Sequence, residues 1–134
     1  MATSEILYLG DLRTSAVHLR SGKTIITDAP LDNQGKGEAF SPTDLAATSL
    51  GTCMITIVGI LAQHHNFSVD GTKLSVTKVM AERPRRISEI IIDLDFPKNG
   101  YSDEQKRMIE VAARNCPVAL SLHPDLKQTL RFNF

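Results

Sequence analysis

The chain has 134 residues, and its 15 basic and 15 acidic side chains give a formal net charge of zero. This length fits one domain over residues 1–134, and it can bury a hydrophobic core without disulfides or a metal. The balanced charge argues against nucleic acid or an anionic membrane surface as a partner, because both require an excess of Lys and Arg. With no Trp, 2 Tyr and 5 Phe, the chain also lacks an aromatic platform for stacked bases.

The first forty residues predict three short strands and a loop. The strands span residues 6–10, 15–20 and 24–27, and the dipeptide Ser21-Gly22 suits a hairpin turn between the last two. Residues 28–40 are mostly polar and contain Pro and Gly, which is typical of a loop. The start of the chain has no basic region, and Glu5 and Asp11 interrupt its apolar residues, so we expect a cytoplasmic protein without a secretory signal.

A long helix is predicted to begin at Ser41-Pro42-Thr43-Asp44 and to run to about His65. Ser41 suits the N-cap, Pro42 the first helical position and Asp44 the third, as in a capping box. Residues 45–62 are 18 uncharged residues, the lower limit for a membrane span. Several Ser, Thr and Gly residues and the lack of flanking anchors favour instead a helix buried on nearly all sides, in a core or a subunit interface.

The second half predicts two strands, a helix and a final strand. Residues 73–81 and 87–96 alternate apolar and polar side chains and form an antiparallel hairpin around residues 83–86. Ser102 and Gln105 form a capping box for a helix that ends near Cys116, since Pro117 cannot continue it. A short turn over residues 118–123 and a strand over 128–132 follow. The order β-β-β-α-β-β-α-β indicates an α+β fold with antiparallel sheets.

The two cysteines, Cys53 and Cys116, lie 63 positions apart. The chain has no CxxC motif, and its four His lack the spacing of a zinc site, so we expect no metal. A permanent disulfide is unexpected in a cytosolic chain. Two buried, inert thiols and a redox-active pair both remain open at this point.

The local setting of each cysteine suggests what its chemistry requires. Cys53 lies in the middle of an apolar helix, so a reactive thiolate there needs a cation, and Arg20 is one candidate. Cys116 precedes Pro117 and could cap a following helix, whose backbone N–H groups would stabilise a thiolate. Asp44 lies on the opposite face of the helix from Cys53, about 13 Å along the axis. It could therefore act only as a cap, or meet another element or the Cys53 of a second copy.

Two segments resemble the OsmC/Ohr family of thiol-dependent hydroperoxide reductases: FSPTDLAATSLGTCMITIVGIL and GYSDEQKRMIEVAARNCPVALSLHPD. The resemblance extends over essentially the whole chain and implies an intertwined homodimer with two central helices. It also implies that Cys53 is the peroxidatic thiolate, which an organic hydroperoxide oxidises to a sulfenic acid, and that Cys116 resolves it to a disulfide. Arg20 resembles the Arg that holds the thiolate. The family needs no bound cofactor, and an external dithiol, lipoyl-type in the Ohr branch, reduces the disulfide.

The acidic partner of the Arg departs from the family pattern. The family often has Glu directly after the helix-starting Pro, where this chain has Thr43, with Asp44 as the substitute beside it. The alternatives are therefore a dimeric binding module for a small apolar ligand with little peroxidase activity, and a structural dimer with inert thiols. Slow alkylation of Cys53 that is insensitive to Arg20→Ala would favour these two, and ligand-induced thermal stabilisation would separate them.

Overall fold

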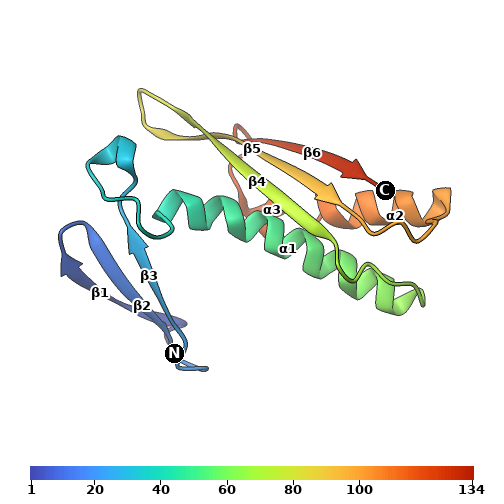
Figure 1. The fold of residues 1–134 in the computed structure, drawn as a ribbon, viewed down its shortest axis with the longest axis horizontal. Helices are drawn as coiled ribbons and strands as arrows, with labels where there is room; N and C mark the ends of the chain where they lie inside the picture. The colour runs from blue at the N-terminus through green and yellow to red at the C-terminus, as the bar shows by residue number, and fades with distance from the viewer. The chain divides into compact units, whose positions relative to one another are not determined.

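The computed structural model describes residues 1–134, which form two compact units, residues 1–46 and residues 47–134. Figure 1 labels their helices and strands, and the structure contains the mixed α+β elements that the sequence predicts.

The first unit is an antiparallel sheet of three strands in the order β1-β2-β3. The strands are β1 (Ser4–Gly10), β2 (Arg13–His18) and β3 (Thr24–Asp28). A short 3-10 helix, η1 (Leu31–Asn33), lies within the predicted loop. All three predicted strands are present, with shifted ends.

The end of β2 differs from the prediction and changes the position of Arg20. The strand ends at His18, so Arg20 lies in the turn and not on the strand. The turn has four residues, 19–22, because the His18 N–H donates to the Lys23 carbonyl at 2.8 Å and the Gly22 N–H donates to the His18 carbonyl at 2.8 Å. Gly22 has a φ of +72°, a conformation that glycine adopts readily.

Helix α1 (Pro42–His64) begins as predicted. The Ser41 N–H donates to Asp44 Oδ2 at 2.9 Å, and the Asp44 N–H donates to Ser41 Oγ at 3.0 Å. The side-chain oxygen of each residue thus accepts a hydrogen bond from the backbone N–H of the other, which is the capping box. Asp44 has a structural role at this helix start whatever else it does.

In the single chain, burial along α1 follows one stripe, so burial on nearly all sides would need a subunit interface. The buried residues recur at helical spacing: Ala47, Leu50, Gly51, Met54, Val58 and Ala62. Thr52, Thr56 and Ile60 lie on an exposed stripe of the same helix. By length and a mean hydropathy of 2.0 the helix could cross a membrane, but core helices of soluble proteins pass the same test.

The second unit contains a three-stranded sheet in the order β4-β5-β6. Its strands are β4 (Lys73–Ala81), β5 (Arg86–Asp95) and β6 (Lys127–Asn133). The β4–β5 hairpin is antiparallel, as predicted, but β6 pairs parallel to β5. The expectation of purely antiparallel sheets is wrong here because helices α2 and α3 return the chain to the start of β5, which is a crossover connection.

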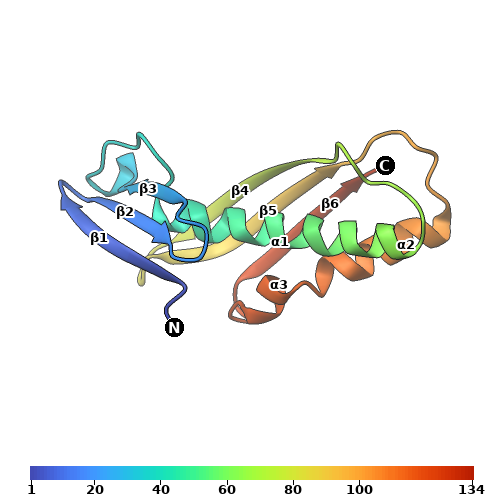
Figure 2. The same cartoon turned by 90° about the horizontal axis from the view of Figure 1, so that it is seen from below.

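Helix α2 (Asp103–Arg114) begins at the predicted capping box, and α3 (Pro117–Ser121) follows after two residues. Figure 2 shows α1 and α2 over one face of the β4-β5-β6 sheet. The core between them contains residues from each element, all fully buried: Leu50, Met54, Ile90, Ile92, Leu94 and Ile109. This packing fixes α1 and the α2–α3 connection, the two segments that contain the cysteines.

Candidate active site

Cys53 lies on α1, is half-buried, and packs at the edge of the core. The Val118 backbone N–H in α3 donates a hydrogen bond to Cys53 Sγ over 3.5 Å. A sulfur that accepts an N–H is better suited to a negative charge than one in purely apolar surroundings. The Val118 N–H therefore supplies part of the polar environment that the apolar helix itself lacks.

Cys116 is fully buried and is the N-cap residue of α3, as the position before Pro117 predicts. Its Sγ accepts a hydrogen bond from the Ala119 N–H at 3.4 Å. Both cysteines are free thiols. Val118 and Ala119 are consecutive, so one turn of backbone serves both sulfurs.

Burial raises the pKa of the Cys116 thiol, and burial is the largest cause. The Ala119 N–H opposes this effect, whereas a hydrogen bond and the charge of Cys53 raise the pKa of Cys116 further. The N-cap amides thus favour the Cys116 thiolate, as expected, but desolvation outweighs them. The structure places the two thiols close together, at consecutive N–H groups of α3.

A side chain from β6 fixes the helix that contacts both thiols. Gln128 Nε2 donates to the Ala119 carbonyl at 3.0 Å. Sequence reasoning missed both Gln128 and Val118. The Val118 donor is a backbone N–H, which residue types do not reveal. The sequence pattern at Gln128 indicates only the start of a strand.

Arg20 and Asp44, the other two predicted site residues, lie in the first unit, and both thiols lie in the second. Arg20 is exposed in its turn and lines a hollow of about 600 Å³ with Met1 and Leu19. Asp44 is engaged in the cap of α1. Their roles in the site stay predictions.

The first unit also contains a buried carboxylate that the sequence analysis did not single out. Asp28 Oδ2 accepts the Glu38 N–H at 3.0 Å and Arg13 Nη2 at 3.2 Å, and Arg13 also pairs with Glu38 at 2.9 Å. The Glu38 N–H, followed by Arg13, lowers the pKa of Asp28 against the opposing effect of its burial. Asp28 is thus a charged group inside the first unit.

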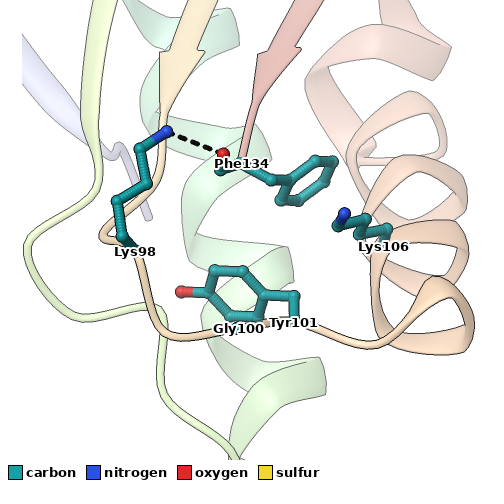
Figure 3. A pocket seen from close by; sticks show the side chains of 5 residues that line it. All are labelled: Lys98, Gly100, Tyr101, Lys106 and Phe134. Atoms are coloured by element: carbon teal, nitrogen blue, oxygen red, sulfur yellow. Dashed lines mark hydrogen bonds between the residues drawn. The ribbon is translucent and has the colours of Figure 1, made fainter.

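A second hollow, of about 320 Å³, lies beside the start of α2, and its lining residues are Lys98, Gly100, Tyr101, Lys106 and Phe134 (Figure 3). Lys98 Nζ donates to the Phe134 carbonyl at 2.7 Å, and Lys106 Nζ lies 5.5 Å from the centroid of the Phe134 ring. Phe134 thus interacts with both amines, and the lining contains no Cys, Asp or Glu side chain. No group of three His, Cys, Asp or Glu side chains in residues 1–134 could hold a metal ion.

The fold and the thiol pair define a class of protein: a small α+β protein in which a long apolar helix and a helix-capping residue bring two cysteines together. The chain belongs to the OsmC-like protein family, whose family model matches residues 35–131. A comparison with curated proteins gives no match.

Solved structures of other proteins support the family and the fold. A Psychrobacter arcticus protein is described as an osmotic stress induced and detoxification response protein. It has 53% identity to this chain and a TM-score of 0.95, and the match covers 99% of this chain and 96% of that chain. An organic hydroperoxide resistance protein from Legionella pneumophila has 13% identity and a TM-score of 0.78, covering 100% and 98%. The organic hydroperoxide resistance protein OhrB of Bacillus subtilis has 14% identity and a TM-score of 0.66, covering 98% of each chain. The last two show the likeness of fold alone.

Proposed function

We propose that this protein is a cytoplasmic two-cysteine peroxidase that reduces organic hydroperoxides to alcohols. The observation that supports this most is the closeness of Cys53 and Cys116, which are 63 positions apart in the sequence but accept hydrogen bonds from the consecutive N–H groups of Val118 and Ala119. A disulfide needs Cα atoms within about 4.4–6.8 Å, and thiols that already lie close together need little movement to form one. Similarity to proteins named for organic hydroperoxide resistance agrees with this substrate class.

The reaction takes two steps on the thiols. The Cys53 thiolate attacks the distal oxygen of the hydroperoxide, the O–O bond breaks, and the alkoxide leaves as the alcohol after taking a proton. Cys53 is then a sulfenic acid. Cys116 attacks its sulfur, a disulfide forms, and the oxygen leaves as water. An external dithiol of the lipoyl type reduces the disulfide, so no bound cofactor is needed.

The raised pKa of Cys116 suits it to the resolving role. A protonated thiol is a poor nucleophile, so Cys116 does not compete with Cys53 for the peroxide. When Cys53 becomes an uncharged sulfenic acid, one of the causes that raise the pKa of Cys116 is removed. Oxidation of the first thiol therefore favours ionisation of the second at the step that needs it.

The proposal assigns Arg20 to the Cys53 thiolate, as the cation that holds it, and Asp44 to the orientation of that Arg. Asp44 would replace the Glu found in relatives at the position of Thr43, and its carboxylate also caps α1. A shorter acid that already accepts a backbone N–H has less freedom to orient a guanidinium. We therefore expect Arg20 to contribute more to the rate than Asp44 does.

The proposal also includes a homodimer. Only Thr27, Asp28 and Ser41 are buried in residues 1–46, and none of them is apolar. Strand β1 exposes apolar side chains on both of its faces, with Ile6 and Tyr8 on one and Leu7 and Leu9 on the other. A three-stranded sheet needs a covered hydrophobic face to be stable, and a second copy supplies such a cover.

Intact mass spectrometry of the reduced protein after one equivalent of cumene hydroperoxide tests the proposal. We expect the wild type to lose two hydrogens within seconds, Cys116→Ser to gain one oxygen, and Cys53→Ser to stay unchanged. A wild-type mass that is unchanged after minutes would contradict the peroxidase. The binding module and the structural dimer with inert thiols would then remain, and thermal shift against small apolar ligands would separate them.

A further inference from the structure

We propose that Gln128 is a positioning residue for the thiol pair: it holds α3 in the place where the Val118 N–H reaches Cys53. The inference rests on the proposed function for its catalytic meaning. It concerns a residue on β6 that is not part of the predicted site.

The first step is the instability of α3 by itself. The helix has five residues, Pro117–Ser121, and an isolated helix of this length does not form in water. Its own bonds are local: the Leu120 N–H donates to the Cys116 carbonyl at 3.1 Å, and Ser121 Oγ donates to the Pro117 carbonyl at 2.8 Å. Its position must come from contacts with other elements.

The second step is the bond that supplies this position. Gln128 Nε2 donates to the carbonyl of Ala119 at 3.0 Å; Ala119 is buried and Gln128 is half-buried. The backbone of Gln128 is fixed in turn, because it pairs with Ile90 in the parallel β5–β6 ladder and Ile90 is fully buried. Gln128 therefore connects a short helix to a strand that pairs with the buried part of β5.

The third step connects this bond to the sulfurs. The N–H of Ala119 points at Cys116 Sγ while its carbonyl accepts from Gln128, and the preceding N–H, of Val118, points at Cys53 Sγ. A rotation of α3 that breaks the Gln128 bond also turns the Val118 N–H away from Cys53. Gln128 thereby acts on the reactive thiolate without touching it.

Alkylation of Cys53 by iodoacetamide tests this, with peptide mapping to separate it from Cys116. Gln128→Met keeps the length of the side chain and removes the donor. We expect its Cys53 to react about two- to tenfold more slowly than wild type at pH 7, the range for the net loss of one ordinary hydrogen bond. At about pH 10 a free thiol is ionised with or without that bond, so we expect equal rates.

The control is Arg131→Met, which introduces the same residue on the same strand. The Arg131 side chain is exposed, and its ion pair with Asp93 is long, at 3.5 Å. It should leave both rates unchanged. Equal rates for Gln128→Met and wild type at pH 7 would overturn the proposal, and so would a change of the same size at both pH values, which indicates altered exposure. If Gln128→Met does not fold by circular dichroism, Gln128→Glu replaces it, with the same expected loss.

The alkylation contains no peroxide and separates the two proposals. A wild type that is inactive toward cumene hydroperoxide contradicts the peroxidase and leaves the role of Gln128 in place. Conversely, if the wild type is active and Gln128→Met alkylates at the wild-type rate at pH 7, only the positioning role is contradicted. Faster hydrogen exchange of the Val118 and Ala119 amides in the variant is a second expected result.

Discussion

At the scale of single residues, Asp28 links the stability of the first unit to pH. Its pKa is lowered by the Glu38 N–H and by Arg13, so the folded state binds its proton less readily than the unfolded chain does. Such a carboxylate stabilises the fold above the pH at which the unfolded chain titrates. That stabilisation is lost as the pH falls through the lowered pKa of Asp28.

We expect Asp28→Asn to reduce the resistance to urea at pH 7. The difference from wild type should shrink as the pH falls below the range in which an aspartate of the unfolded chain titrates, because the stabilisation is lost toward the lowered pKa of Asp28. Urea unfolding at several pH values measures this. Asp11→Asn, at an exposed carboxylate in the same unit, is the control and should behave as wild type throughout. A constant difference between Asp28→Asn and wild type from pH 7 to pH 3 would argue against the linkage.

At the scale of elements, Gly51 sets the distance between α1 and the sheet. A Cβ at this position would lie 3.1 Å from Val76 Cγ2 and 3.6 Å from Leu74 Cδ2, both on β4. Glycine in the middle of a helix costs about 1 kcal/mol relative to alanine. Its presence here is explained by the close approach of the helix to the strand.

We expect Gly51→Val to lower the free energy of unfolding by about 1–3 kcal/mol, the usual range for overpacking a core. Urea denaturation measures the change. Gly59→Val, at the other glycine of the same helix, where an added Cβ would meet nothing within 4 Å, controls for the change of helix propensity from glycine to valine. A Gly51→Val variant as stable as the control would show that α1 can move away from β4 without loss.

The helices, strands and turns also show which features the sequence can predict and which it cannot. The helix starts at Ser41 and Ser102 were predictable because a capping box involves residues three apart. The parallel pairing of β6 was not, since it depends on how α2 and α3 return the chain across the sheet. The turn after His18 was placed too late, because the residue types do not distinguish a two-residue hairpin turn from a four-residue one.

In the candidate site, too, local features were predictable from the sequence and tertiary contacts were not. The spacing of Cys53 and Cys116 left their relation open, and only the resemblance to a family paired them. Cys116 as an N-cap was predictable from the proline that follows it, but the raised pKa required knowledge of its burial. The Val118 N–H and the Gln128 amide depend on tertiary contacts that no local pattern records.

At the scale of the whole molecule, the apolar side chains of β1 predict association. We expect the wild type to be a dimer by sedimentation equilibrium, and Ile6→Lys to raise the dissociation constant at least tenfold. Removing one buried Ile side chain from an interface costs about 1.5–3 kcal/mol, and a lysine there adds a desolvated charge. Ile6 is 71% exposed in the single chain, so a change in the monomer does not account for that result.

Glu5→Lys is the matched control, because it places the same lysine at the adjacent exposed position of β1. It should leave the dimer intact. A monomeric wild type, or an Ile6→Lys protein that sediments as the wild type does, would contradict the homodimer.

The position of β6 in the chain has a consequence for the order of folding. The β4–β5 hairpin joins neighbouring segments and can form early, whereas β6 follows every other element and must pair across two intervening helices. If Gln128 holds α3 as proposed, we expect α3 to reach its final place only after this late pairing. The two thiols would then come together at the end of folding, and a partly folded chain would have less opportunity to form a premature disulfide.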